Sequence, residues 1–81
     1  MVTEHTIGND TRAGIIALVE QEKERRHWSD AQLCRELGIA ASQWSRIKSG
    51  ERDMSLDFVR AVARVFPALK LKLASFAVEG P

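Results

Sequence analysis

Hydrophobic residues recur at intervals of three and four along most of the chain, which is the spacing of amphipathic helices. One apolar stripe lies between residues 11 and 26 and consists of Ile15, Ile16, Leu18 and Val19. Another lies between residues 55 and 66 and consists of Leu56, Val59, Val62, Ala63 and Phe66. Both segments are therefore predicted to form helices that bury one face.

Between these two segments, a capping signal marks a helix that begins at Asp30. Ser29 is followed three residues later by Gln32, which is the spacing of a capping box. Gly38 is expected to end this helix, because glycine readily adopts the left-handed conformation found at helix C-termini. Cys34, one turn before Gly38, is interpreted as a small core residue rather than a reactive thiol.

A further short helix is predicted from Ala41 to Ser49, with Trp44 and Ile47 buried and Gly50 after its end. Only a tight turn joins it to the preceding helix, so the two helices must cross steeply. Residues 30–49 are thus predicted to form a helix-turn-helix.

The C-terminal segment, residues 67–78, supports two interpretations. Pro67 suits the first turn of a fifth helix that would place Leu69, Leu73 and Phe76 on one face. From residue 69 to residue 73, however, leucine and lysine alternate with a period of two, which is typical of a strand.

Taken together, these patterns predict an all-α fold, a compact bundle of four to five short helices that contains a helix-turn-helix. A single domain is expected over residues 11–78, between a flexible N-terminal tail at residues 1–10 and a short tail at residues 79–81.

Composition and charge narrow the class of protein. The chain has 81 residues, and its twelve Lys and Arg side chains against eleven Asp and Glu give a net charge of +1. No apolar run approaches the ~20 residues of a membrane span, and one cysteine points to a reducing cytoplasm. No cofactor or metal is expected, since His5, His27 and Cys34 match no zinc spacing.

Catalysis is not expected either, because no nucleophile–base pair is apparent and so short a chain can scarcely enclose a pocket. The charge is nonetheless unevenly placed: residues 23–52 hold seven basic and four acidic side chains. A basic stretch of this kind is either a solvated face or a surface for an acidic partner.

A helical wheel separates two faces of the segment from Ala41 to Ser49. With Trp44 and Ile47 inward, the outward face carries Ser42, Ser45, Arg46 and Ser49. This face is slim and lacks the Glu/Lys pairs of an ordinary solvent face. It could enter a DNA major groove, which is about 12 Å wide.

Residues 28–66 resemble the lambda-repressor/Cro-like (XRE-type) helix-turn-helix domains. The resemblance is carried by the run from Ser29 to Ile39, with its cap, small residue, leucines and turn glycine, and by the run from Ser42 to Gly50. It implies an all-α domain that binds double-stranded operator DNA as a transcription regulator, commonly as a homodimer. The short chain is more similar to a Cro-type regulator than to a two-domain repressor.

Several positions depart from the family pattern. Asp30 stands where relatives commonly have a Gln that contacts phosphate, and Ala40 replaces the usual Ser or Thr cap, whose loss costs about 1 kcal/mol. Trp44 is larger than the usual Val or Ile and is interpreted as core. Many relatives pair an Arg on the first helix with a Glu where Lys48 stands, so a reversed pair between Glu20 and Lys48 is expected.

The candidate DNA-binding residues are Ala41, Ser42, Gln43, Ser45, Arg46, Lys48 and Arg52. Arg46 is the candidate for bidentate contact to guanine O6 and N7, and Ala41 for contact with a thymine methyl. Ser42, Gln43 and Ser45 would make flanking base or phosphate contacts. Arg52 would contact phosphate, whereas Lys48, like Arg35, is equally well read as a solvated side chain.

Two further questions concern partners. Leu69, Leu73 and Phe76 form a possible dimer interface, or else they close the core of one chain. An alternative function is that of an antitoxin or adaptor, in which the helix-turn-helix acts mainly through a toxin or another protein partner. The low net charge favours this alternative, as does Asp30, whose carboxylate is expected to repel phosphate.

Overall fold

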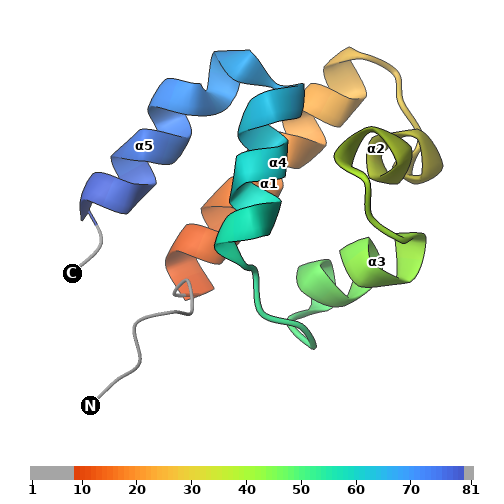
Figure 1. Ribbon diagram of the computed structural model, residues 1–81, viewed down its shortest axis with the longest axis horizontal. Coiled ribbons are helices and arrows are strands. Elements are labelled where there is room, and N and C mark those ends of the chain that lie inside the picture. The colour runs from red at the N-terminus through yellow and green to blue at the C-terminus, as the bar shows by residue number, and fades with distance from the viewer. Residues whose placement is uncertain (1–8, 80–81) are drawn as a thin grey trace.

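A computed structural model describes the backbone of residues 9–79 and the side chains of residues 10–75, and it confirms the all-α prediction (Figure 1). The described elements are α1 (Asn9–Arg25), α2 (Asp30–Leu37), α3 (Ala41–Ser49), α4 (Leu56–Val65), the 3-10 helix η1 (Pro67–Leu69) and α5 (Lys70–Glu79). In Figure 1, α4 lies in front of α1, with α5 on one side and the α2–α3 pair on the other. None of the described helices has the length and hydropathy needed to cross a bilayer.

The structure moves two predicted boundaries outward. Helix α1 begins at Asn9, so the last two residues assigned to the N-terminal tail are helical, while residues 1–8 lie outside the described residues. Helix α5 continues to Glu79, which takes the first residue of the predicted C-terminal tail.

The strand alternative for residues 67–78 is wrong. This segment forms η1 followed by α5, and Leu69 and Leu73 are both buried. Leu71, between them, is 85% exposed. The buried leucines are therefore four positions apart rather than two, which is the spacing of a helix. The alternation of leucine with lysine does not reflect a strand.

Side-chain and glycine caps set the ends of α2, as the sequence predicts. The Ser29 hydroxyl accepts a hydrogen bond from the Gln32 backbone N–H at 3.1 Å, and Gly38 follows the helix with a left-handed φ of 77°. Ser55 caps α4 in the same way, accepting from the Phe58 N–H at 3.2 Å. These local interactions place the helix ends independently of the rest of the fold.

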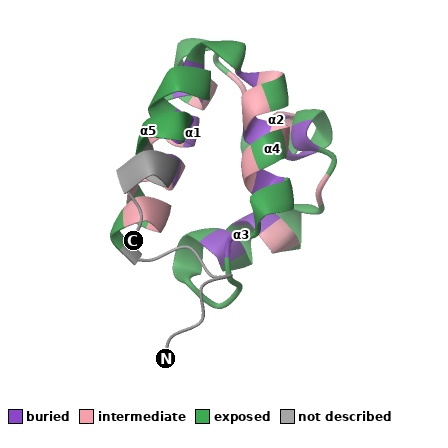
Figure 2. Ribbon diagram, turned by 60° about the vertical axis from the view of Figure 1, so that its left-hand side comes forward, coloured by how far each residue is buried: buried purple, intermediate pink, exposed green. Residues whose placement is uncertain are grey.

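The core lies where α1, α2, α3 and α4 converge, and Leu69 of η1 and Leu73 of α5 extend it (Figure 2). Trp44 from α3 is 1% exposed and stacks on Phe58 of α4, with 5.9 Å between ring centroids. Cys34 is buried and unpaired on α2, which confirms its interpretation as a core residue. The large Trp44 ring thus anchors α3 to the rest of the molecule.

Candidate nucleic-acid interface

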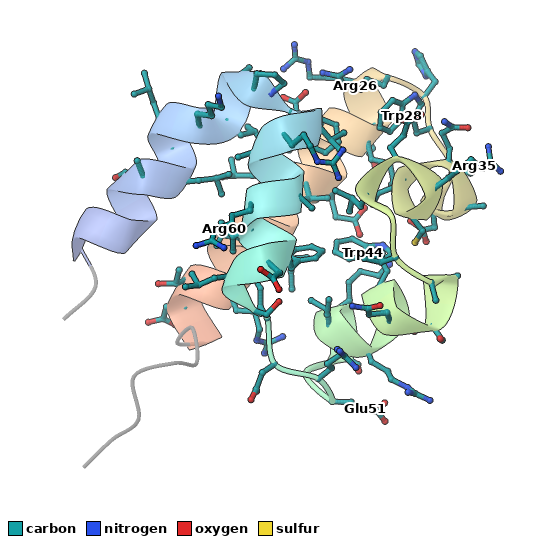
Figure 3. All side chains as sticks on the ribbon, viewed as in Figure 1. Arg26, Trp28, Arg35, Trp44, Glu51 and Arg60 are labelled. Atoms are coloured by element: carbon teal, nitrogen blue, oxygen red, sulfur yellow. The ribbon has the colours of Figure 1, made fainter. Side chains whose placement is uncertain are left out.

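Helix α3 has two chemically distinct faces, as predicted. Trp44 and Ile47 are buried, whereas Ser42, Ser45, Arg46 and Ser49 are exposed. Figure 3 shows Trp44 pointing from α3 towards α4, while the opposite side of the helix is free of other elements. An exposed helix face of small hydroxyl side chains and one guanidinium is therefore presented on a rigid base.

The two ends of α3 are held differently. Ala40 occupies the N-cap position and makes no side-chain capping bond, as expected from the loss of the usual hydroxyl. At the other end, Gly50 adopts a φ of 90°, and the Arg12 guanidinium donates a hydrogen bond to the Ile47 carbonyl at 2.9 Å. A Cβ at Gly50 would be in van der Waals contact with Arg12 Nη2 at 3.4 Å, and the positive φ makes any side chain there strained.

Arg12 was not among the residues predicted from the sequence. It is the only basic side chain among residues 1–22, and this isolation is the one signal that could have drawn attention to it. From α1, it neutralises part of the negative end of the α3 dipole. Arg12 therefore fixes the C-terminal end of the helix that carries Arg46.

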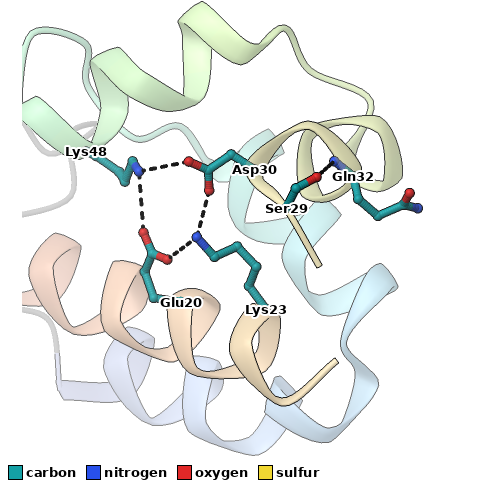
Figure 4. Close-up of polar contacts among 6 residues, drawn as sticks. All are labelled: Glu20, Lys23, Ser29, Asp30, Gln32 and Lys48. Carbon is teal, nitrogen blue, oxygen red and sulfur yellow. Dashed lines mark hydrogen bonds and ion pairs between the residues drawn. The ribbon is translucent and has the colours of Figure 1, made fainter. Parts of the chain in front are cut away.

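Four charged side chains join α1, α2 and α3 in one network (Figure 4). The Lys48 ammonium lies 3.5 Å from a Glu20 carboxylate oxygen and 3.5 Å from an Asp30 oxygen. The Lys23 ammonium lies 2.7 Å from Asp30 and 2.8 Å from Glu20. The predicted reversed pair between Glu20 and Lys48 is confirmed, and Lys23 is a partner that sequence reasoning missed.

This network changes the interpretation of two residues. Lys48 is held between α1 and α2, with its ammonium also 5.2 Å from the Trp44 ring centroid, so its charge belongs to the packing of α3 and not to the face with Arg46. Asp30, which was expected to repel phosphate, is paired with two ammonium groups. Its carboxylate therefore presents little net charge to a ligand.

The pKa values of the network shift in the directions that pairing requires. The hydrogen bond from Lys23 holds the pKa of Asp30 below its ordinary value of 3.8, and the Lys48 charge adds to this effect. Hydrogen bonds to Asp30 and Glu20 raise the pKa of Lys23 above 10.5. Folding thus favours the charged form of both groups.

These shifts predict how stability depends on pH. Asp30 contributes fully to the free energy of unfolding above its unfolded pKa, and this contribution is lost as the pH falls through its lowered folded pKa. The contribution of Lys23 is instead lost as the pH rises through its raised folded pKa. Relative to Asp30→Asn, the wild-type protein should lose its advantage in unfolding free energy below about pH 4. Denaturant unfolding at a series of pH values measures this, and a constant difference down to about pH 2 would contradict it.

The other predicted residues are distributed as follows. Ala41 is exposed and Gln43 is half-buried, at the edge of the outward face. Arg52 is exposed, and its backbone N–H donates to the Arg46 carbonyl at 3.2 Å. Arg35, on α2, donates to the Gln32 side-chain carbonyl at 3.0 Å.

Two of the three possible dimer-interface residues do not lie on the surface of the described chain. Leu69 and Leu73 are buried in the core of the single chain, as the alternative interpretation expected. The Phe76 side chain lies outside the described residues. Among residues 67–75, whose side chains are described, Leu71 is a large hydrophobic residue that is exposed.

Helices α2 and α3 are joined by residues 38–40 and cross steeply in Figure 1, and the outward face of α3 is exposed. This arrangement defines a small helix-turn-helix domain. A family model described as a helix-turn-helix domain matches residues 17–70, and the chain belongs to this family. The match runs from within α1 to the first residue of α5 and agrees with the resemblance to lambda-repressor/Cro-like domains. No curated protein and no solved structure gives a significant match.

Proposed function

We propose that this protein is a sequence-specific regulator of transcription that places α3 in the major groove of double-stranded DNA. The observation that carries the proposal is the exposed face with Ser42, Ser45 and Arg46, opposite a face locked by Trp44 and Ile47. We further propose that it acts in the cytoplasm, without catalysis, as a homodimer on a palindromic operator.

The chemistry of the exposed face supports this assignment. The Arg46 side chain is 60% exposed, and its terminal nitrogens can donate together to guanine O6 and N7. Serine side chains are short enough to let the helix approach the base edges, and Ala41 can contact a thymine methyl. Arg52, at the end of the helix, would contact a phosphate.

One feature of α5 supports a protein contact. Leu71 is 85% exposed between Lys70 and Lys72, and we propose that it contributes to the homodimer contact. A second candidate function is that of an antitoxin or adaptor, in which Leu71 would instead contact a toxin or another protein. The net charge of +1 favours this candidate.

Selection of bound sequences from a random duplex pool at physiological salt tests the proposal. A regulator should enrich one motif, and a homodimer should enrich two inverted half-sites about 34 Å apart. A single half-site would contradict the dimer.

The enriched duplex then allows a salt titration. The logarithm of the association constant should fall linearly with the logarithm of the salt concentration, with a slope of about 0.9 per phosphate contacted. Absence of both enrichment and salt dependence would contradict DNA binding and leave the protein-binding function.

A further inference from the structure

An acidic side chain lies beside the guanidinium that the proposed function assigns to guanine. Glu51 follows the C-cap Gly50, and its Oε1 lies 3.9 Å from Arg46 Nε. Figure 3 shows Glu51 at the outer end of α3, away from the core. Both side chains are more than half exposed, so burial does not force this pair together.

Hydrogen bonds hold the backbone of Glu51 against the end of α3. The Ser49 hydroxyl donates to the Arg46 carbonyl at 3.1 Å, and the Glu51 N–H donates to that same hydroxyl at 3.3 Å. The Arg52 N–H also donates to the Arg46 carbonyl, at 3.2 Å. The turn after α3 is therefore folded back on the residue that carries the guanidinium, and Glu51 has a defined place beside it.

The atom of Arg46 that Glu51 approaches determines which of its donors remain free to contact a base. A guanidinium has five N–H donors, and bidentate contact with guanine uses those of the terminal nitrogens. Glu51 faces Nε, which leaves Nη1 and Nη2 of Arg46 available. A further approach of about 1 Å would give a charge-assisted hydrogen bond of ordinary length.

We propose that Glu51 is a positioning residue that holds Arg46 through Nε and presents its terminal nitrogens to guanine. This inference rests on the proposed function and adds a determinant of specificity to it. Holding the side chain in one orientation lowers the entropy lost on contact with guanine. It gives no such advantage with an unrelated sequence, where the carboxylate lies among phosphates and repels them.

The variant Glu51→Gln tests this role, because its affinity for the operator and its affinity for unrelated DNA should not change in the same direction. Its affinity for the selected operator should fall about two- to fivefold, the range expected for an exposed ion pair. Its affinity for an unrelated duplex of equal length should stay the same or rise up to about twofold, because a negative charge is removed. The ratio of the two affinities therefore falls.

Glu24→Gln is the matched control, since it removes one exposed carboxylate near the end of α1, far along the chain from α3. Both of its affinities should stay within about twofold of wild type and move together. In an Arg46→Ala background, Glu51→Gln should no longer lower operator affinity, since there is no guanidinium to orient. Replacing guanine by 7-deazaguanine in the operator should likewise lower the affinity of the Glu51→Gln variant less than it lowers the affinity of the wild-type protein.

If Glu51→Gln raises both affinities by the same factor, Glu51 is only a charge that repels phosphate, and the proposal is overturned. The same follows if the loss of operator affinity persists in the Arg46→Ala background. Failure of the proposed function is recognised separately, because the wild-type protein would then enrich no sequence at all.

Discussion

Replacing Arg46 by alanine is expected to lower affinity for the selected operator by about ten- to a hundredfold, while binding to unrelated DNA falls far less. A bidentate contact to guanine discriminates against other bases by roughly 1–3 kcal/mol, and loss of one cation removes a further electrostatic contribution. Titration of both duplexes by fluorescence anisotropy, at one fixed salt concentration, measures the effect.

Two further variants separate geometry from charge. Arg46→Lys keeps the charge but cannot donate in the planar, two-pronged arrangement, so it should lose most of the operator preference. Arg60→Ala removes an arginine of α4 whose side chain is 77% exposed, against 60% for Arg46, and which pairs with Asp57 at 3.6 Å. This variant should leave operator affinity nearly unchanged. An operator affinity within twofold of wild type for Arg46→Ala would show that Arg46 does not read a base.

The largest effect on stability is expected for Trp44→Ala, at about 3–5 kcal/mol of unfolding free energy. Trp44 is among the largest fully buried side chains and stacks on Phe58, so its removal leaves a cavity between α3 and α4. A domain of this size has a total stability on the order of 4–12 kcal/mol. Denaturant unfolding followed by circular dichroism measures the change.

Controls distinguish the cavity from a general loss of hydrophobicity. Trp44→Phe should be less destabilising, because it keeps an aromatic ring against Phe58. Leu56→Ala truncates a leucine that is 61% exposed and should cost less than about 0.5 kcal/mol. A loss below about 1 kcal/mol for Trp44→Ala would contradict its anchoring role.

The parts of the fold that follow from the sequence are those fixed by neighbouring residues. Ser29 with Gln32, and Gly38, set the ends of α2 through contacts within a few positions. The same holds for the two faces of α3, because helical geometry alone places Ser45 opposite the side that carries Ile47. Such features need no knowledge of the tertiary structure.

The parts that escaped prediction depend on contacts between distant segments. Arg12 reaches a carbonyl thirty-five positions away, and Lys23 completes a network whose members come from three helices. For residues 67–78, the alternation of leucine and lysine is compatible with a strand or a helix. Only the burial of Leu69 and Leu73 in the core decides between the two. Contacts with distant segments limited the predictions for Arg12 and for residues 67–78. Lys23 lies only three positions from Glu20 and seven from Asp30, and it was missed because its pairing depends on how α2 packs beside α1.

The division of α3 into an anchored side and a free side has a practical consequence for redesign. The anchors Trp44, Ile47 and Lys48, together with Arg12 beneath the end of the helix, share no position with Ser42, Ser45 or Arg46. Combinatorial libraries that vary only the latter three positions should therefore retain the native scaffold. Such libraries would allow new target preferences to be evolved on one unchanged framework.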